Sequence, residues 1–335
     1  MERVGTAAAL RRIGPEALSI RRRRRGRGFE YLDDAGRRLT DPAILERIRS
    51  LAIPPAYRDV RIALAANAHL QAVGRDDAGR LQYRYHPNWE VVRDRRKSAQ
   101  LVDFCGVLGR IRRRVSRDLR LKGLPRRRVL AAVVMLIDRT HIRIGCEDYV
   151  HSGRSRGAAT LTKRNVRCRS GVVALGFTGK GGRRIECEIT SKPLARVIAE
   201  LERVPGSRLF QYRDDESRLR RVSAAEVNRY LQEIAGVAVT AKNFRTLAAS
   251  AVAARILAEM EPSSSRRGRR RQTAAVVAQV AEMLGNTPAV ARKSYVLPQV
   301  LTAFKEGRLQ AACAGRALPG LKRGEAAVRR LLEDS

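Results

Sequence analysis

Tyr295, near the C-terminal end of the chain, stands in a segment whose residue types suit nucleophilic chemistry. A phenol is a poor nucleophile at its ordinary pKa of about 10, but neighbouring cations would favour the phenolate. Asn286, nine positions earlier, could donate a hydrogen bond to a phosphate oxygen. A single tyrosine is more often a core residue, so this segment needs partners elsewhere in the chain.

Two arginines lie where helices are expected to end or begin, and each could hold a phosphate group. Arg143, in the segment Ile142–Gly145, closes a mostly apolar helix, and its guanidinium could bind two phosphate oxygens at once. Arg245, in the segment Lys242–Thr246, starts another helix, and helix N-termini favour anions. The alternative is structural. Arg143 could satisfy helix carbonyls, and Arg245 could be an exposed first-turn arginine without a role.

A lysine at the tip of a glycine-rich turn could supply a proton. Lys180 lies in Phe177–Gly182, between Val172–Phe177 and Arg184–Ile189, which have the pattern of a β-hairpin. From that position it could act as general acid toward a leaving 5′ oxygen, whereas the alternative is an ordinary solvated turn lysine. A nucleophile, phosphate-binding cations and an acid are the groups that break a phosphodiester without a metal or a nucleotide.

The charge of the chain indicates the class of its partner. The 335 residues include 69 Lys and Arg against 33 Asp and Glu, a net charge of +36. This excess favours a nucleic acid, because each phosphate that is neutralised releases condensed counterions. Acidic membrane surfaces, or a composition that is merely solvated, are the alternatives. Because the sequence has no run of about 18 apolar residues and no apolar signal core, we expect no membrane partner and a cytoplasmic protein.

Other kinds of chemistry find little support. The cysteines are widely spaced, form no C-x-x-C pair and have no histidines at ligand spacing, so neither a disulfide framework nor a metal site is expected. The sequence contains no P-loop and no G-x-G-x-x-G motif. We therefore expect no cofactor and no nucleotide.

The candidate groups need a scaffold, and the hydrophobic pattern predicts an α+β protein in three parts. We expect residues 1–28, with the run Arg21–Arg25, to form a basic flexible arm. Residues 29–92 alternate in polarity and are broken by prolines, as in a small, mostly β domain. Residues 93–335 have helical spacing, which predicts a larger, mainly α domain that includes the β-hairpin or small sheet. The cluster Arg266–Arg271 is interpreted as a polar, basic linker.

Taken in order, the four segments resemble the active-site motifs of the type IB DNA topoisomerases, in particular the compact bacterial and poxviral enzymes. These motifs are an I-R-x-G arginine, a hairpin G-K lysine, an [LF]-R-T arginine and an [HN]-T-P-x(6)-Y tyrosine, and the match extends from about Asp41 to about Leu301. The resemblance implies five catalytic residues, namely Arg143, Lys180, Arg245, Asn286 and Tyr295. It also implies that residues 29–92 bind DNA and that residues 93–335 form the catalytic domain.

The resemblance further implies DNA contacts outside the catalytic group. Tyr83 and Tyr85 look like a pair that reads the major groove, and alternation places both on one strand face. Arg80 and Gln82 belong to the same segment, and Tyr149 looks like another DNA-contacting tyrosine of the family. The alternative for the first two tyrosines is a hydrophobic strand face.

One position departs from many members of the family. Asn286 stands where poxviral and many eukaryotic relatives have histidine, and an amide cannot act as an acid. Proton donation should therefore fall to Lys180, with Arg143 as a second candidate. The activity implied is relaxation of supercoiled duplex DNA through a 3′-phosphotyrosyl intermediate, strand rotation and religation, without ATP or metal. We expect a monomer that closes as a clamp on double-stranded DNA of the nucleoid.

Two other functions remain open. Tyrosine recombinases share this chemistry, but they typically carry a histidine three residues before the second arginine, where this chain has Lys242. They also act as tetramers. A non-enzymatic DNA-binding protein of the nucleoid would bind through charge alone, and it would have no need of Tyr295.

Overall fold

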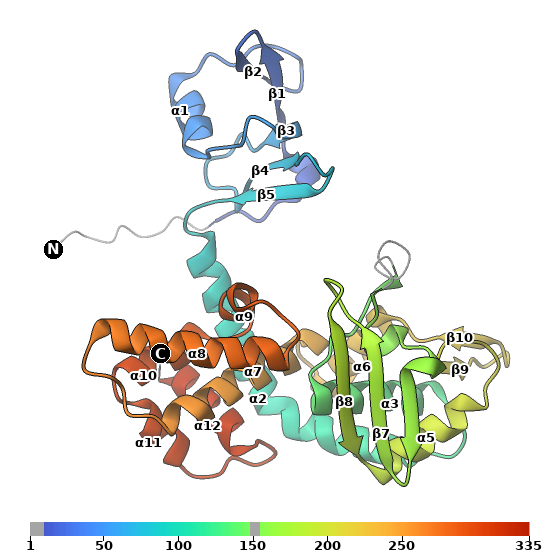
Figure 1. Cartoon of the computed structure of the whole chain (residues 1–335). Helices are drawn as coiled ribbons and strands as arrows, with labels where there is room; N and C mark the ends of the chain where they lie inside the picture. Colours follow the sequence, from blue (N-terminus) through green and yellow to red (C-terminus); the bar gives the residue numbers. More distant parts are fainter. Residues whose placement is uncertain (1–9, 148–154, 335) are drawn as a thin grey trace. The chain divides into compact units, whose positions relative to one another are not determined.

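The computed structural model describes residues 10–147 and 155–334, and the chain divides into two compact units, Met1–Lys97 and Ser98–Ser335 (Figure 1). Strands dominate the first unit and helices the second. The predicted α+β class, with a mostly β N-terminal part and a mainly α remainder, is confirmed.

The first unit is a five-stranded antiparallel sheet with one helix packed against it. Its strand order is β2-β1-β3-β4-β5. The elements are η1 (Pro15–Ala17), β1 (Ile20–Arg25), β2 (Gly28–Leu32), α1 (Pro42–Ser50), β3 (Arg58–Ile62), β4 (Leu70–Arg75) and β5 (Leu81–Tyr85). Asp41 caps α1, since its carboxylate accepts from the backbone N–H of Ala43 at 2.8 Å. Ile48 of α1 packs with Ile20 and Ile62 on one face of the sheet. A smaller buried cluster, which includes Leu18, Ala63 and Val73, lies on the other face.

The prediction of a flexible arm over residues 1–28 is wrong for its second half. Residues Ile20–Arg25 form β1, which pairs with β2 on one side and with β3 on the other. Arg22 shows why an arginine run can be a strand here. Its guanidinium donates to the carbonyl oxygens of Pro54 at 3.1 Å and Tyr57 at 2.6 Å, so the charged group has fixed partners.

The second unit is built from helices and two small sheets. Its elements are α2 (Trp89–Asp118, which begins in the first unit), α3 (Arg126–Thr140), η2 (Ala158–Thr160), η3 (Lys163–Asn165), β6 (Val166–Arg169), β7 (Val172–Thr178), β8 (Arg184–Thr190), α5 (Lys192–Glu202), β9 (Gln211–Arg213), β10 (Leu219–Arg221), α6 (Ala224–Ala235), α7 (Ala241–Ala258), α8 (Arg266–Met283), α9 (Pro288–Ser294), α10 (Pro298–Lys305), α11 (Leu309–Ala314) and α12 (Arg323–Glu333). The three-stranded antiparallel sheet, ordered β6-β7-β8, lies against α3 and α5. It contains the predicted hairpin.

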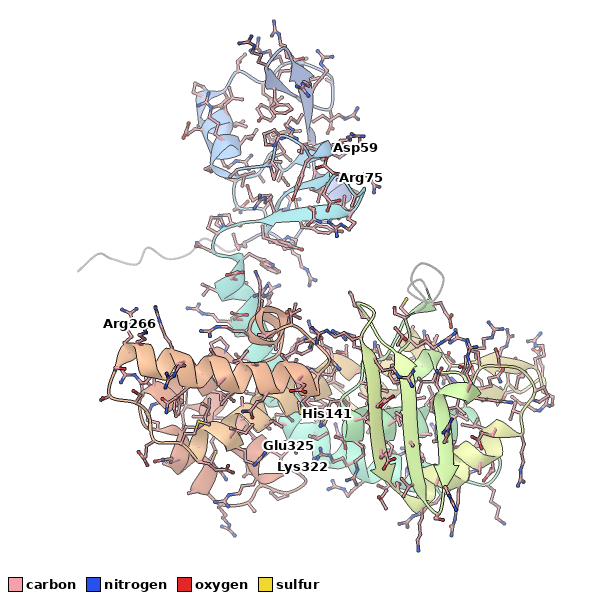
Figure 2. The ribbon with its side chains drawn as sticks, viewed as in Figure 1. Asp59, Arg75, His141, Arg266, Lys322 and Glu325 are labelled. Atoms are coloured by element: carbon pink, nitrogen blue, oxygen red, sulfur yellow. The ribbon has the colours of Figure 1, made fainter. Side chains whose placement is uncertain are left out.

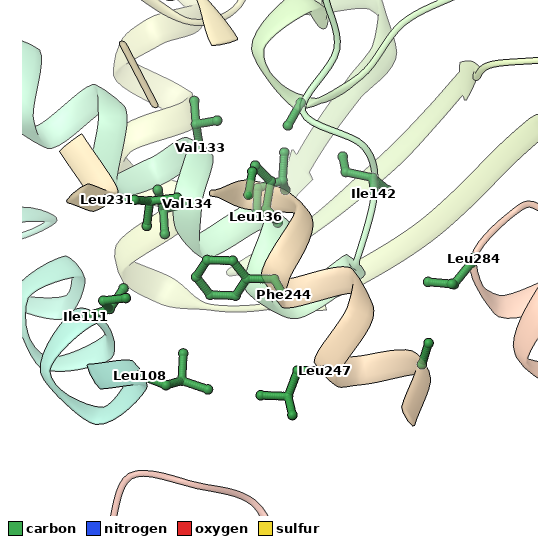
Figure 3. Packing of buried hydrophobic residues seen from close by; sticks show 14 of the residues in the cluster. Leu108, Ile111, Val133, Val134, Leu136, Ile142, Leu231, Phe244, Leu247 and Leu284 are labelled. Carbon is green, nitrogen blue, oxygen red and sulfur yellow. The ribbon is translucent and has the colours of Figure 1, made fainter. Parts of the chain in front are cut away.

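Helix α7 is the centre of the second unit. It contacts α3, α6, α8, α10, α11 and α12. Phe244, in its first turn, packs edge-to-face against Phe104 of α2 with ring centroids 4.8 Å apart, and Leu247 continues the same apolar cluster (Figure 3). A residue in the first turn of α7 is therefore held rigidly by the core on several sides.

The cluster Arg266–Arg271 is not a linker, contrary to the prediction, because α8 begins at Arg266 (Figure 2). The side chain of Ser265 accepts from the backbone N–H of Gly268 at 2.9 Å and caps the helix. Arg269 donates to the carbonyl oxygen of Ser263 at 2.7 Å. Arginine is a good helix former, so a cap was enough to start a helix within the basic run. Over the described ranges, no helix is long and apolar enough to cross a membrane.

Candidate active site

A cavity of about 260 Å³ in the second unit collects four of the five predicted catalytic side chains. Arg143, Lys180, Arg245 and Tyr295 all line it. They come from the segment after α3, the β7–β8 turn, the N-terminal part of α7 and the C-cap of α9. Segments far apart in sequence thus place one phenol, two guanidinium groups and one ammonium group around a space large enough for a phosphate.

Helix α9 places Tyr295 at its C-terminal end. Thr287 caps the helix by accepting from the backbone N–H of Val290 at 3.3 Å, and Pro288 occupies the first helical position. The backbone N–H of Tyr295 donates to the carbonyl oxygen of Ala291 at 3.0 Å. The side chain is only 8% exposed, yet it lines the cavity. Tyr295 therefore belongs to the buried core cluster of this unit and also borders the cavity that the cations line.

The surroundings of Tyr295 favour its phenolate. Burial by itself raises the pKa of the phenol, but the nearby charge of Arg245 and a hydrogen bond to it, followed by the charges of Arg143 and Lys242, lower it by more. The net shift is downward from the ordinary value. The guanidinium carbon of Arg245 lies 5.0 Å from the centre of the Tyr295 ring.

Arg245 is oriented by two backbone carbonyl groups. It is 3% exposed, and it donates to the carbonyl oxygens of His141 and, at 3.0 Å, Leu284. Its Nε is buried and has no hydrogen-bond partner within the described residues. Burial lowers its pKa, and Tyr295 partly offsets this. The side chain is thus locked in place while one N–H donor remains unused.

Arg143 and Asn286 contact each other directly. Arg143 donates through Nη2 to Oδ1 of Asn286, which is 4% exposed. Since a guanidinium has only donors, the amide oxygen must face Arg143 and the amide nitrogen must point elsewhere. That nitrogen is buried and unpartnered within the described part of the chain. Asn286 follows Gly285, whose positive φ of 61° ends α8, and it does not line the cavity itself.

Two glycines hold the backbone of Arg143 in place. Gly145 has a φ of 84°, and a Cβ there would lie 2.9 Å from the backbone nitrogen of Gly157. A Cβ on Gly157 would lie 2.4 Å from the carbonyl oxygen of Arg143. This close approach lets the N–H of Ala158 donate to that same carbonyl at 2.8 Å. Larger residues at either glycine would push the loop that carries Arg143 away.

Lys180 lies in the turn between β7 and β8, as the hairpin pattern predicts. Gly181 and Gly182 have φ angles of 79° and 75°, a conformation that suits glycine. The turn carries Lys180 to the cavity wall. Two further cations, Arg156 and Lys242, line the same cavity, and the sequence reasoning did not assign either one a role. Lys242 could have been identified from the sequence, because it lies in the first turn of α7, three residues before Arg245.

The predicted DNA-contacting residues separate into two groups in the first unit. Tyr83 and Tyr85 are 44% and 46% exposed on one face of β5, with their rings stacked 6.2 Å apart. Arg80 and Gln82 are instead tied to Asp76, whose Oδ2 accepts from each of them at 2.9 Å. Tyr149, the remaining candidate, lies outside the described residues.

Comparisons of the sequence with known proteins identify its family. Residues 86–312 match the sequence model of the family described as eukaryotic DNA topoisomerase I, catalytic core. Residues 28–76 match that of the bacterial DNA topoisomerase IB N-terminal domain. The DNA topoisomerase 1B of Acanthamoeba polyphaga mimivirus is 32% identical over 270 residues, which cover 78% of this chain and 80% of the relative. The chain therefore belongs to the type IB DNA topoisomerase family and is an isomerase that acts on DNA.

Proposed function

We propose that Tyr295 is the nucleophile of this topoisomerase and that Arg143, Lys180, Arg245 and Asn286 act with it. The observation that carries the proposal is the single cavity in which the phenol meets both guanidinium groups and Lys180. The lowered pKa of Tyr295 supports the same role, because cleavage requires the phenol to lose its proton.

In the proposed reaction the Tyr295 Oη attacks the phosphorus atom of one DNA strand, and the phenolic proton leaves to solvent. The bond between phosphorus and the 5′ oxygen breaks, and that oxygen takes its electron pair and a proton from Lys180 Nζ. The products are a 3′-phosphotyrosyl link and a free 5′ hydroxyl. After the free end rotates, the 5′ hydroxyl attacks the phosphotyrosyl bond and restores the strand. Because the covalent link conserves the phosphodiester energy, the cycle requires neither ATP nor a metal.

The remaining residues would stabilise the charge that develops on phosphorus. The guanidinium groups of Arg143 and Arg245 are suited to bind the non-bridging oxygens, and the unpartnered Nε of Arg245 is one such donor. The unpartnered amide nitrogen of Asn286 could donate to the same group. Its bond to Arg143 would then orient both donors together.

We also propose the DNA contacts that the sequence suggests. The exposed, stacked rings of Tyr83 and Tyr85 offer an aromatic surface that could contact base edges in the major groove. Arg80 and Gln82, both held by Asp76, would contact DNA beside them. The role of Tyr149 remains a sequence prediction.

The working form that we propose is a monomer whose two units close around duplex DNA as a clamp. A net charge of +36 supports tight, sequence-independent contact with the backbone. With DNA as its substrate, the place of action would be the nucleoid in the cytoplasm.

The test is to trap the covalent intermediate. A duplex whose cleaved fragment dissociates would be incubated with the protein without ATP or magnesium, and the linked residue would be mapped by mass spectrometry. We expect DNA on Tyr295 and no adduct with Tyr295→Phe, whereas Tyr212→Phe, at a residue of similar burial in the same unit, should still form it. An adduct on any other residue would overturn the proposal.

A further inference from the structure

The sheet of the first unit carries arginines in an unusual arrangement on the face opposite α1, beside the small buried cluster that includes Ala63 and Val73. Ile20 of β1 and Ile62 of β3 are direct partners and are buried on the α1 side. Because side chains alternate along a strand, the next pair, Arg21 and Arg61, must point to the other face. These two arginines are directly opposite each other, and both are exposed.

A bulge in β3 adds a second arginine pair to this face. Arg58 and Arg61 are three residues apart, so a regular strand would place them on opposite faces. The pairing shifts between them, however, since their partners on β4 are Arg75 and Val73, two residues apart. Asp59, within the bulge, has a φ of 50°. The extra residue therefore turns Arg58 to the same face as Arg61, where it lies directly opposite Arg75.

The protein leaves most of this charge uncompensated. Glu30 pairs with Arg23 at 2.6 Å, further along the same face, and Asp59 lies 3.7 Å from Arg75 (Figure 2). Across the described ranges, the side chains of Arg21, Arg58 and Arg61 make neither an ion pair nor a hydrogen bond. Like charges on directly opposite strand positions destabilise a sheet. An arrangement that opposes folding and is supported by a backbone irregularity points to an anionic partner.

The other face of β1 shows that the exposed pairs are not simply a result of composition. Arg22 points to that face, where its guanidinium binds backbone carbonyl groups and lies 4.1 Å from the centre of the Phe29 ring. It has a structural role. Arg24, on that same face, is exposed and stands opposite Phe29, not opposite another arginine.

We propose that Arg21, Arg58, Arg61 and Arg75, which we call the arginine patch, form a docking surface for the sugar–phosphate backbone of duplex DNA. Guanidinium groups match phosphate geometry, and two adjacent pairs suit a polymer with repeated phosphates better than a single anion. The register continues the patch toward β5, since Leu81 is the partner of Arg75 and Tyr83 the partner of Val73 on this face. Contact between the arginine patch and the sugar–phosphate backbone would thus position the duplex next to the Tyr83 and Tyr85 rings of β5.

The inference rests on DNA being the substrate of the family and does not depend on which residue is the nucleophile. Binding can therefore be measured in a Tyr295→Phe background, where the duplex stays intact. The variant is Arg21→Ala with Arg61→Ala. The matched control is Arg24→Ala with Arg49→Ala, which removes the same charge from other exposed positions of the first unit.

We expect the patch variant to bind duplex DNA more weakly whatever its sequence. The slope of log K against log salt should fall by roughly 0.9 for each phosphate that the variant no longer neutralises, or by about 2 for the pair, and the control should change much less. With Tyr295 intact, the rate of adduct formation at saturating DNA should stay as in the unchanged protein.

Thermal unfolding supplies the second measurement. Removing a like-charge pair should leave the midpoint unchanged or raise it, so that weaker DNA binding occurs in a protein that is at least as stable. Affinity and salt slope equal to those of the control would overturn the inference. So would a fall in the melting temperature together with weaker binding, because the arginines would then be structural. Loss of adduct at saturating DNA would instead place the patch in the catalytic step, which also contradicts the inference.

Discussion

The hydroxyl of Ser250 donates a hydrogen bond to the backbone carbonyl oxygen of Tyr295 at 3.1 Å, and it accepts one from the backbone N–H of Leu297, also at 3.1 Å. Ser250 is fully buried in α7, five residues after Arg245. One helix therefore carries a proposed phosphate-binding arginine and also fixes the backbone of the proposed nucleophile. That pair of hydrogen bonds ties the segment around Tyr295 to α7.

The first prediction follows from this relationship. Ser250→Ala leaves a buried carbonyl and a buried N–H without partners, at a cost of about 1–3 kcal/mol each in the free energy of unfolding. Slight displacement of Tyr295 should lower single-turnover cleavage by roughly tenfold or more. Thr273→Val, which removes another buried hydroxyl that bonds only within its own helix, should reduce stability alone. Equal cleavage rates for the two variants would refute a positioning role for Ser250.

A second prediction concerns Asn286. Asn286→Asp keeps an oxygen for Arg143 but removes the amide donor, and Asn286→Leu removes both. If the amide nitrogen serves the phosphate, both variants should lose about 10²–10³ in cleavage rate while DNA affinity is retained. The measurement is single-turnover cleavage at saturating DNA. An active Asn286→Asp variant would show instead that the residue acts only by holding Arg143.

A third prediction uses the pH dependence of cleavage. Lys242 is one of the cations that lower the pKa of Tyr295, so Lys242→Ala should raise that pKa. The rising limb of the plot of rate against pH should move to higher pH, and the rates of the two proteins should approach each other in alkaline solution. Arg292→Ala, at a neighbouring cation outside the cavity, is the control. An unmoved rising limb would contradict this account of the phenolate.

A fourth prediction concerns stability and His141, which follows α3 and whose carbonyl binds Arg245 (Figure 2). Burial, followed by the charge of Lys322, lowers the pKa of His141 to about 4. In the unfolded chain the imidazole takes up a proton near pH 6.5, whereas in the folded protein it does so only near pH 4. The free energy of unfolding therefore has its full value above about pH 6.5 and decreases as the pH falls toward 4. The shift corresponds to roughly 3 kcal/mol.

Denaturant unfolding at pH 7 and at acidic pH checks this. His141→Asn tolerates the φ of 57° at this position and has no proton to gain. The loss of stability between the two pH values should therefore be smaller in the variant. The same loss in both proteins would assign the acid sensitivity to other groups.

Local patterns in the sequence predicted a large part of this fold. The segment Lys242–Thr246 was expected to start a helix, and α7 indeed begins at Ala241; the glycine-rich turn indicated the hairpin that carries Lys180. Both signals are local, because they depend on neighbours along the chain. The predictions of a flexible arm at Arg21–Arg25 and a linker at Arg266–Arg271 were wrong for the same reason, because they too used only local sequence. Their charge resembles that of a disordered segment, whereas partners such as the carbonyl of Tyr57 for Arg22 come from elsewhere in the structure.

The sequence by itself determined the class of chemistry and the family, because residue types in a fixed order carry that information without coordinates. Only the tertiary structure decided which groups meet. Ser250 and Tyr295 are 45 positions apart, and Arg143 and Asn286 are 143 apart. Contacts of that kind depend on how helices pack around α7, and the face on which Arg58 lies in the first unit depends on the β-bulge at Asp59. No pattern of neighbouring residues specifies either one.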